Sequence, residues 1–335
     1  MTVPLQFGVN IAWLSRGEAP PAEAARAAEA AGFDVVTAAD HVGSTSPFVA
    51  LAVAAAVTER VRLRTYVLDF GFWNPGLLAR DVATLDAVSG GRVELGVGVG
   101  HMRHEHEAVG LPFAPYGERL AALERFVAEV REHLAGPTPS PRPVQDSVPV
   151  LMGSMSRRGL EVAARIADVV ALTGLLTGPG GSGPASFRLV TPAEFDERVA
   201  WVRDLRAEHG RPQAPLDMLV QKVVLDRDPQ EAAEADAAED AAEGADTTPE
   251  SLLASPSFLY ARTPAEAAAV LAERSQRWGI GSWCVHQPSM AAMARVIAAV
   301  RALRPHSCRA RCWTISAAGS TSPRRWAASS RWCRR

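Results

Sequence analysis

The chain has 335 residues, of which 47% are hydrophobic and 21% are charged, and its formal net charge is -2 at pH 7. This composition is typical of a soluble globular protein and excludes a broad electrostatic attraction to nucleic acid or to an anionic membrane. No apolar run is long enough for a transmembrane helix, and residues 1–10 lack a basic region followed by an apolar run, so we expect a cytoplasmic protein.

All four cysteines lie in the C-terminal part of the chain. The first is Cys284, so a fold built by the preceding residues cannot depend on disulfide bonds. The others fall in the segment 305–335, which is rich in arginine and tryptophan, lacks acidic residues and has no hydrophobic periodicity. We expect residues 1–304 to form a single domain and residues 305–335 to be an irregular basic tail, disordered or non-native.

Hydrophobic periodicity predicts strands and helices that alternate along the chain. The predicted strands are 5–13, 33–40, 61–68, 92–100, 149–153, 168–173, 216–225 and 281–286. The predicted helices are 21–31, 47–57, 76–88, 116–134, 158–167, 192–209, 230–246, 264–278 and 290–303. Strand–helix units in this number indicate a (β/α)₈ TIM barrel of parallel strands, with insertion loops at its C-terminal face. We rank a doubly wound sheet second, because residues 10–20 lack the glycine-rich phosphate turn that such a sheet needs after its first strand.

The predicted strand 92–100 ends in alternating glycines. Gly96, Gly98 and Gly100 share one face of the strand. Glycine weakens a strand unless another group must approach the backbone closely. We interpret the three as room for a flat ligand at the end of the strand, and the alternative is a tight barrel interior that requires small residues.

Polar residues follow the second and fourth strands, where a barrel of this kind places its chemistry. The second strand ends in Asp40 and His41, and the carboxylate could orient the histidine for proton transfer. The alternative is that Asp40 caps the next helix and that His41 only fills space. The residues after the fourth strand are His101, His104, Glu105 and His106. Together with His41 they also allow a metal site, which we consider the weaker hypothesis because the loop spacing supplies only two ligands.

The fifth strand is followed by Gly153-Ser-Met-Ser-Arg157, directly before a helix. Small residues, hydroxyls and an arginine at a helix N-terminus can bind a phosphate, because free N–H groups and the helix dipole favour an anion there. Thr173, at the end of the sixth strand, could add a hydroxyl. The alternative is ordinary helix capping.

Together these residues resemble the bacterial luciferase-like monooxygenase superfamily. The resemblance includes Gly32-Phe-Asp-Val-Val-Thr-Ala-Ala-Asp-His41, Ser89-Gly-Gly-Arg-Val-Glu-Leu-Gly-Val-Gly-Val-Gly100 and Val148-Pro-Val-Leu-Met-Gly153. It continues through 58–65, 74–75, 83–86, 163–168, 262–266 and 277–281, in the family's order over residues 5–303. Within the superfamily the chain is most similar to the coenzyme F420-dependent oxidoreductases.

The resemblance implies a luciferase-like barrel that holds coenzyme F420, or alternatively FMN, at its C-terminal mouth. It makes Asp40, His41 and His101 the catalytic candidates and implies a non-prolyl cis peptide within Thr65–Leu68. The cofactor-binding candidates that it implies are Asp40, Thr65, Tyr66, Val67, Val99, Gly100, His101, His104, Gly153, Ser154, Met155, Ser156 and Thr173.

The activity that the resemblance implies is hydride transfer between F420 and a small organic substrate. The alternatives are an FMN-dependent monooxygenase that uses reduced flavin and O₂, and an inactive barrel that serves as a cofactor carrier or subunit. Expected partners are a second copy in a homodimer and a flavin or F420 reductase. The related F420-dependent glucose-6-phosphate dehydrogenases have glutamate at the position of His101 and lysine at that of Leu175, which argues against a sugar phosphate here. Phe70-Gly-Phe-Trp73, Leu175 and Leu176 favour an apolar or aromatic substrate.

Overall fold

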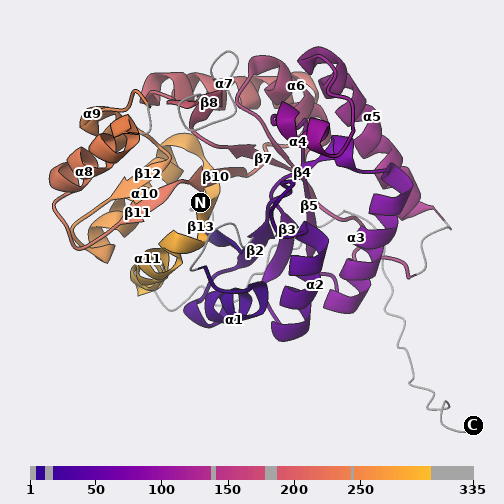
Figure 1. The fold of residues 1–335 in the computed structure, drawn as a ribbon, viewed down its shortest axis with the longest axis horizontal. Helices are drawn as coiled ribbons and strands as arrows, with labels where there is room; N and C mark the ends of the chain where they lie inside the picture. The colour runs from indigo at the N-terminus through magenta and orange to yellow at the C-terminus, as the bar shows by residue number, and fades with distance from the viewer. Residues whose placement is uncertain (1–4, 12–17, 137–140, 178–186, 243–244, 303–335) are drawn as a thin grey trace, which may run out of the picture.

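The computed structural model describes residues 5–11, 18–136, 141–177, 187–242 and 245–302. Its centre is a closed ring of eight parallel strands surrounded by helices (Figure 1). The predicted (β/α)₈ barrel is therefore confirmed. Within the described ranges, no helix is both long and apolar enough to cross a membrane. The predicted tail, 305–335, lies outside them.

The barrel strands keep the order of the chain around the ring, and the pairing of β3 with β5 closes one side. They are β1 (Gln6–Asn10), β2 (Val35–Ala38), β3 (Arg62–Thr65), β5 (Val93–Gly98), β6 (Val150–Gly153), β7 (Val169–Leu172), β10 (Leu216–Val220) and β13 (Ile280–His286). All neighbours in the ring run parallel, so their carboxyl ends meet at one mouth.

The helices that cover the ring begin and end at local sequence signals. They are α1 (Pro21–Ala31), α2 (Pro47–Val57), α3 (Pro75–Ser89), α5 (Tyr116–Ala135), α6 (Arg157–Ile166), α7 (Pro192–Glu208), α10 (Pro264–Trp278) and α11 (Met290–Ala302). Gly32 ends α1 in the left-handed conformation, with φ 88°. Asn74 caps α3 by accepting from two backbone N–H groups, and Thr191 forms a capping box with Glu194 at α7.

Several short elements were not predicted. The predicted strand 216–225 divides, because β11 (Lys222–Val224) leaves the ring and pairs with β12 (Phe258–Tyr260) beside α8 (Pro229–Ala242) and α9 (Pro249–Ala254). The mouth carries the hairpin of β8 (Leu175–Thr177) and β9 (Phe187–Leu189) and the helix α4 (Arg103–Ala108). The predicted strand 61–68 also divides, because a cis peptide separates β3 from β4 (Leu68–Asp69).

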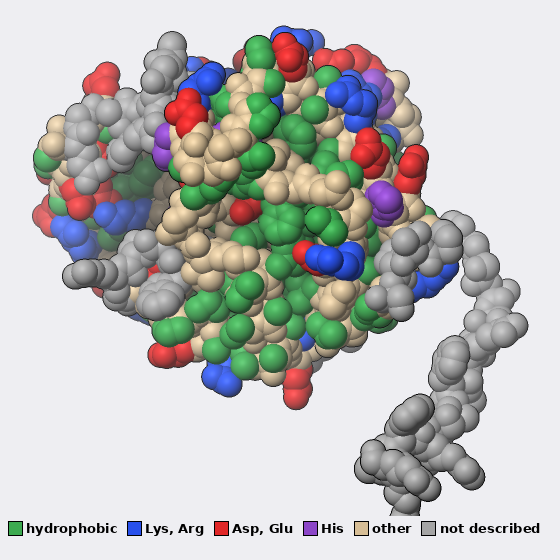
Figure 2. Space-filling view, turned by 45° about the vertical axis from the view of Figure 1, so that its right-hand side comes forward, with side chains coloured by type: hydrophobic (Ala, Val, Ile, Leu, Met, Phe, Trp, Pro, Cys, Tyr) green, Lys and Arg blue, Asp and Glu red, His purple; other side chains and the backbone are tan. Residues whose placement is uncertain are grey.

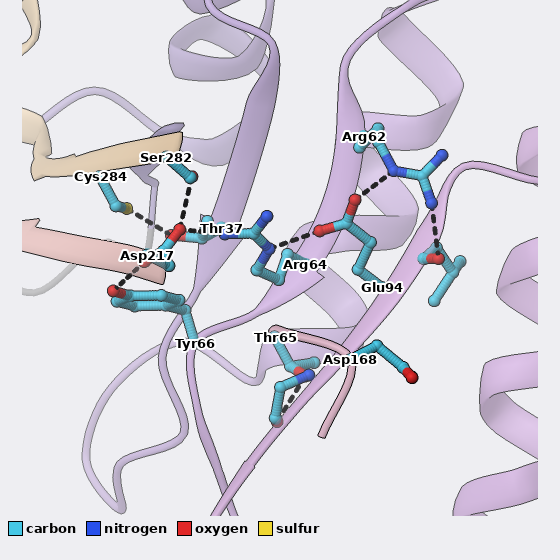
Figure 3. A network of polar contacts seen from close by, with 12 residues as sticks. Thr37, Arg62, Arg64, Thr65, Tyr66, Glu94, Asp168, Asp217, Ser282 and Cys284 are labelled. Atoms are coloured by element: carbon cyan, nitrogen blue, oxygen red, sulfur yellow. Dashed lines mark hydrogen bonds and ion pairs between the residues drawn. The ribbon is translucent and has the colours of Figure 1, made fainter. Parts of the chain in front are cut away.

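The interior of the barrel is charged, although most of the core is apolar. Side chains alternate along each strand, so one set faces the helices and the other faces the barrel axis. Arg64 on β3 faces the axis and is 1% exposed. It donates to Glu94 Oε2 at 2.5 Å and to Asp217 Oδ2 at 2.6 Å (Figure 3). Ser282 on β13 donates to the same carboxylate of Asp217. The buried charges are therefore paired and hydrogen-bonded, as burial requires.

Candidate active site

The segment between β3 and β4 bends into the mouth at the peptide bond between Tyr66 and Val67, which is cis. The predicted non-prolyl cis peptide is confirmed. The hydroxyl of Tyr66 donates to Asp217 Oδ1 at 2.5 Å, so its ring points down into the barrel (Figure 3). Thr65 Oγ1 donates to the carbonyl of Gly96 and accepts from its N–H, both at 2.8 Å. Of the three predicted cofactor contacts in this segment, only Val67 has a side chain that is partly exposed.

Gly96 and Gly98 on β5, and Gly100 just after it, make room for this segment. A Cβ atom on Gly96 would lie 2.0 Å from the carbonyl oxygen of Thr65, and one on Gly100 would lie 2.0 Å from Asp69 Oδ2. A Cβ on Gly98 would lie 2.8 Å from Cγ2 of Val67. Protein atoms of the neighbouring segment fill the space beside these glycines, as the alternative of a tight barrel interior requires. Contact between Gly100 and a flat ligand stays a prediction.

The carboxylate of Asp40 lies beneath the rim of the mouth. It accepts from Trp73 Nε1 at 2.8 Å and from the backbone N–H of Asp69. Burial raises the pKa of Asp40, and the negative charge of Asp69 raises it further, whereas the two hydrogen bonds act in the opposite direction. The prediction that Asp40 orients His41 is wrong, because the carboxylate that contacts His41 Nδ1 is that of Glu105.

The carboxylate that orients His41 belongs to Glu105. Nδ1 of His41 lies 2.9 Å from Glu105 Oε1, and the two side chains are 34% and 9% exposed. Since a carboxylate only accepts, Nδ1 carries the hydrogen, and Nε2 lies on the edge of the ring that faces away from Glu105. The arrangement is that of a histidine held in one tautomer for proton transfer.

His101 lies beside His41 at the same mouth. The ring centroids are 5.9 Å apart and the planes are nearly perpendicular. Although the His101 side chain reaches solvent, partial desolvation lowers its pKa, and the neighbouring His41 lowers it further. Two of the predicted catalytic residues are thus brought together as neighbouring imidazoles.

The remaining members of the histidine cluster point in different directions. His106 is buried, with Nε2 2.8 Å from Asp69 Oδ2 and Nδ1 3.0 Å from the carbonyl of Pro112. It thereby fixes α4 to β4. His104 is exposed on α4. In the part of the chain that the structure describes, no group of three His, Cys, Asp or Glu side chains is arranged to hold a metal ion.

The segment after β6 forms the first turn of α6. Ser156 is the N-cap: its Oγ accepts from the N–H of Gly159 at 3.1 Å and lies 2.7 Å from the hydroxyl of Tyr116. A Cβ on Gly159 would lie 2.1 Å from Ser154 Oγ and 2.7 Å from that tyrosine hydroxyl, so glycine is required for the hydroxyls to gather there. The first N–H groups of a helix have no partner inside the helix. Hydroxyls, free N–H groups and the positive helix end form a site suited to an anion.

Other predicted contacts are occupied by protein groups. The Met155 side chain is buried in the core, and its carbonyl accepts from Arg198 Nε at 3.1 Å. Thr173 Oγ1 donates to the carbonyl of Leu175 at 3.2 Å. Gly153 ends β6 at the mouth and is partly exposed. These residues shape the mouth, and the structure does not test whether they touch a cofactor.

The sequence did not identify Arg119, on α5, as a mouth residue. Its Nε donates to the carbonyl of Val99 at 3.1 Å and its Nη2 to that of Gly100 at 3.2 Å. The guanidinium also lies 3.7 Å from the ring centroid of Phe113. Arg119 therefore holds the end of β5 in place, and the helical pattern around it gave no signal of this role.

The aromatic residues after β4, which were expected to line an apolar pocket, pack against other protein rings. Phe70 packs against Phe126 on α5, with centroids 5.7 Å apart, and Phe72 packs against His106, with centroids 4.8 Å apart. Trp73 reaches the candidate site through its hydrogen bond to the carboxylate of Asp40.

The fold places the chain among the (β/α)₈ barrel enzymes, and comparisons with known proteins narrow this class. A family model described as luciferase-like monooxygenase matches residues 12–295. An F420-dependent glucose-6-phosphate dehydrogenase from Nakamurella multipartita is 31% identical over 67% of this chain and 69% of its own length. The chain belongs to the luciferase-like monooxygenase family.

Further relatives are more distant or less completely covered. An uncharacterised protein from Mycobacterium tuberculosis is 32% identical over 56% of this chain, and the chain spans 64% of that protein's length. Among solved structures, an F420-dependent secondary alcohol dehydrogenase in complex with an F420–acetone adduct has a TM-score of 0.70 and 18% identity, with coverage of 89% of this chain and 99% of that one. At this identity the structural match supports the fold alone.

Proposed function

We propose that the protein is an oxidoreductase that transfers a hydride between coenzyme F420 and a small organic substrate. The observation that carries the proposal is that His41, held by Glu105, lies at the same barrel mouth as the anion site at the start of α6. The name of the Nakamurella relative and the family membership support F420 as the cofactor.

The residues present fit such a cofactor. F420 has a flat redox ring and a tail that carries a phosphate. Ser154, Ser156 and Tyr116, with the N–H groups of the α6 turn, would hold the phosphate. The partly exposed side chain of Val67, beside the Tyr66–Val67 peptide, offers an apolar surface for the ring. When bound, F420 supplies a ring carbon that accepts or donates a hydride.

The protein residues control the proton that accompanies the hydride. In oxidation of an alcohol, the hydride leaves the carbinol carbon and the hydroxyl proton passes to Nε2 of His41. Glu105 stabilises the imidazolium that forms, because the Nδ1 hydrogen already points at its carboxylate. The hydrogen bond between Trp73 and Asp40 holds the residues next to His41 in place. The ring of His101 lies beside that of His41 and adds a second imidazole to the site.

An FMN-dependent monooxygenase is the second candidate, and the description of the matching family favours it. Separate titrations of the purified protein with F420, FMN and FMNH₂ distinguish the two. The F420 proposal predicts saturable binding of F420 and no oxygen consumption with any substrate. Binding of FMNH₂ alone, followed by substrate-dependent oxygen uptake, would refute it.

We also propose that the protein forms a homodimer through α2 and α3, which pack side by side. Helix α2 has no charged residue, yet Val49 is 62% exposed and Val53 is 38% exposed. On α3, Leu77 is 53% exposed and Val88 is 69% exposed. Figure 2 shows hydrophobic side chains gathered on this side of the molecule. A helix that is apolar all round is normally covered, and a second copy of the same face would cover it.

A further inference from the structure

A cleft outside the ring of strands is formed by residues of α7, α9, β12 and α10. The layer that contains α9 and β12 lies beside the barrel, with its own small hydrophobic core and its own two-stranded sheet (Figure 1). None of the residues that line the cleft belongs to the candidate active site. Its volume is about 240 Å³. Pockets for drug-sized ligands measure about 300–1,000 Å³, so this cleft suits a smaller molecule.

Apolar and charged side chains share the walls of the cleft. Trp278 and Tyr260 are 3% and 9% exposed, and Pro192, Leu253 and Val270 add aliphatic surface. The indole N–H of Trp278 donates to a carboxylate of α7 at 2.7 Å, and the hydroxyl of Tyr260 donates to one of α8 at 2.8 Å. The polar atoms of both rings are therefore satisfied by protein groups, and the rings contribute apolar surface.

The charged residues that line the cleft are Glu273, Arg274 and Arg277, all on α10. Arg277 is neutralised by Asp196, because its Nε and Nη2 donate to the two carboxylate oxygens at 3.0 and 2.5 Å. Glu273 is exposed to solvent. No carboxylate of a described residue forms an ion pair with Arg274, and the charge that acts on it is that of Glu273. Arg274 is therefore a cation of this cleft that has no direct countercharge among the described residues.

Part of the Arg274 guanidinium holds the segment that leads into β12. Nη1 donates to the carbonyls of Pro256 and Phe258 at 3.1 and 2.8 Å, and Nη2 donates to that of Ser255 at 3.1 Å. A guanidinium has five N–H donors. Among the groups that the structure describes, none accepts from Nε or from the second hydrogen of Nη2. Arg277 uses these same two nitrogens to hold a carboxylate, so this edge of Arg274 matches a carboxylate as well.

The charge of Arg274 persists at neutral pH. Burial lowers the pKa of Arg274 to about 10, against the smaller opposite effect of Glu273, so the guanidinium is protonated at pH 7. A charge that loses hydration without a countercharge is unfavourable. A carboxylate bound at the Nε edge would supply the countercharge.

We propose that this cleft binds a small organic acid. The carboxylate of the acid accepts from Nε and Nη2 of Arg274, and its apolar or aromatic body packs against Trp278 and the aliphatic wall. An organic acid is favoured over an inorganic anion, because a bare anion would leave the apolar surface beside Arg274 without contact. The site is separate from the barrel mouth, and the inference does not depend on the binding of F420.

The test is a titration of the full-length protein, without added cofactor, with sodium benzoate. Binding is followed in the indole ¹H–¹⁵N NMR spectrum, in which the signals of Trp278 and of Trp73 at the mouth are assigned by their loss in Trp278→Phe and Trp73→Phe. We expect a saturable shift of the Trp278 signal with a Kd on the order of 1 mM, and no shift of the Trp73 signal. Benzamide, which has the same shape without the charge, and acetate, which lacks the ring, should each bind at least about tenfold more weakly.

Two substitutions on α10 should change the affinity in opposite directions. Val270 lies four residues before Arg274, the spacing at which a glutamate and an arginine pair on a helix. Val270→Glu should therefore occupy the Nε edge and abolish benzoate binding, while the carbonyl contacts of Arg274 remain. Glu273→Gln removes a competing negative charge and should lower the Kd about twofold to fivefold. Arg125→Gln, which changes an exposed arginine on α5, is the matched control and should leave the Kd unchanged.

Several results would overturn the inference. A shift of the Trp73 signal in place of the Trp278 signal would locate the acid at the mouth, and the absence of any saturable shift would exclude the site. Equal affinity for benzamide would show that the charge is irrelevant. Unchanged binding in Val270→Glu, whose fold is verified by the remaining indole signals, would exclude Arg274 as the ligand's partner. The binding of F420 is measured separately and is tested by none of these outcomes.

Discussion

Replacement of Glu105 by glutamine tests the proton-transfer role of His41. The substitution preserves the shape of the side chain and removes the negative charge 2.9 Å from His41 Nδ1. A hydrogen bond to a charged group contributes about 1.5–3 kcal/mol in a protein. Because the His41 side chain is 34% exposed, solvent screening favours the lower end, about 1.5 kcal/mol. If this stabilises the imidazolium in the transition state, kcat falls about tenfold.

The assay is stopped-flow measurement of F420 reduction under single-turnover conditions, with an alcohol as substrate. His41→Ala should lower the rate about 100-fold or more, and the double variant should be no slower, because Glu105 acts through His41. Glu107→Gln, on the exposed side of α4, is the matched control and should retain the wild-type rate. A wild-type rate in Glu105→Gln, or multiplicative effects in the double variant, would refute the reasoning.

Three other substitutions probe the anion site, the interface and the interior. Gly159→Ala places a Cβ 2.1 Å from Ser154 Oγ and should weaken F420 affinity about tenfold, with no loss of affinity for the phosphate-free deazaflavin chromophore in a fluorescence titration; equal losses would contradict an anion site. Val49→Glu should shift the protein from dimer to monomer in analytical ultracentrifugation, and an unchanged mass would exclude this interface. Tyr66→Phe leaves Asp217 Oδ1 without its donor and should lower the free energy of unfolding by about 1–3 kcal/mol in urea denaturation, whereas unchanged stability would show that the bond contributes little.

The barrel was predictable because its signals are local. Most strands appeared as apolar runs, and several helices had a start or stop residue such as Asn74 or Gly32. The strand ends also located Asp40 and His41, because the position of chemistry in a parallel barrel follows from the order of the elements.

The partners of these residues were not predictable, because they depend on contacts far apart in the chain. Glu105 lies 64 positions from His41, on a six-residue helix with too few turns for a periodic signal. Arg64 and Asp217, which pair inside the barrel, are 153 positions apart. The packing beside Gly96 and Gly98 on β5 was not predictable for the same reason: the sequence reveals the absence of a side chain and not what occupies the space.

The contact between hydroxyl groups at the anion site was also not predictable from the sequence. Tyr116 was assigned to a helix, and only the packing of α5 against α6 brings its hydroxyl to Ser156. The nature of the tail at 305–335, likewise, remains a prediction from composition.

A crystal structure of the protein soaked with F420 tests the central claim most directly. We expect the deazaflavin ring in the barrel mouth, between His41 and the Tyr66–Val67 peptide, with the tail phosphate within hydrogen-bonding distance of Ser154 or Ser156. A cofactor bound elsewhere, such as in the surface depression between Arg274 and Trp278, or a phosphate remote from α6, would contradict it.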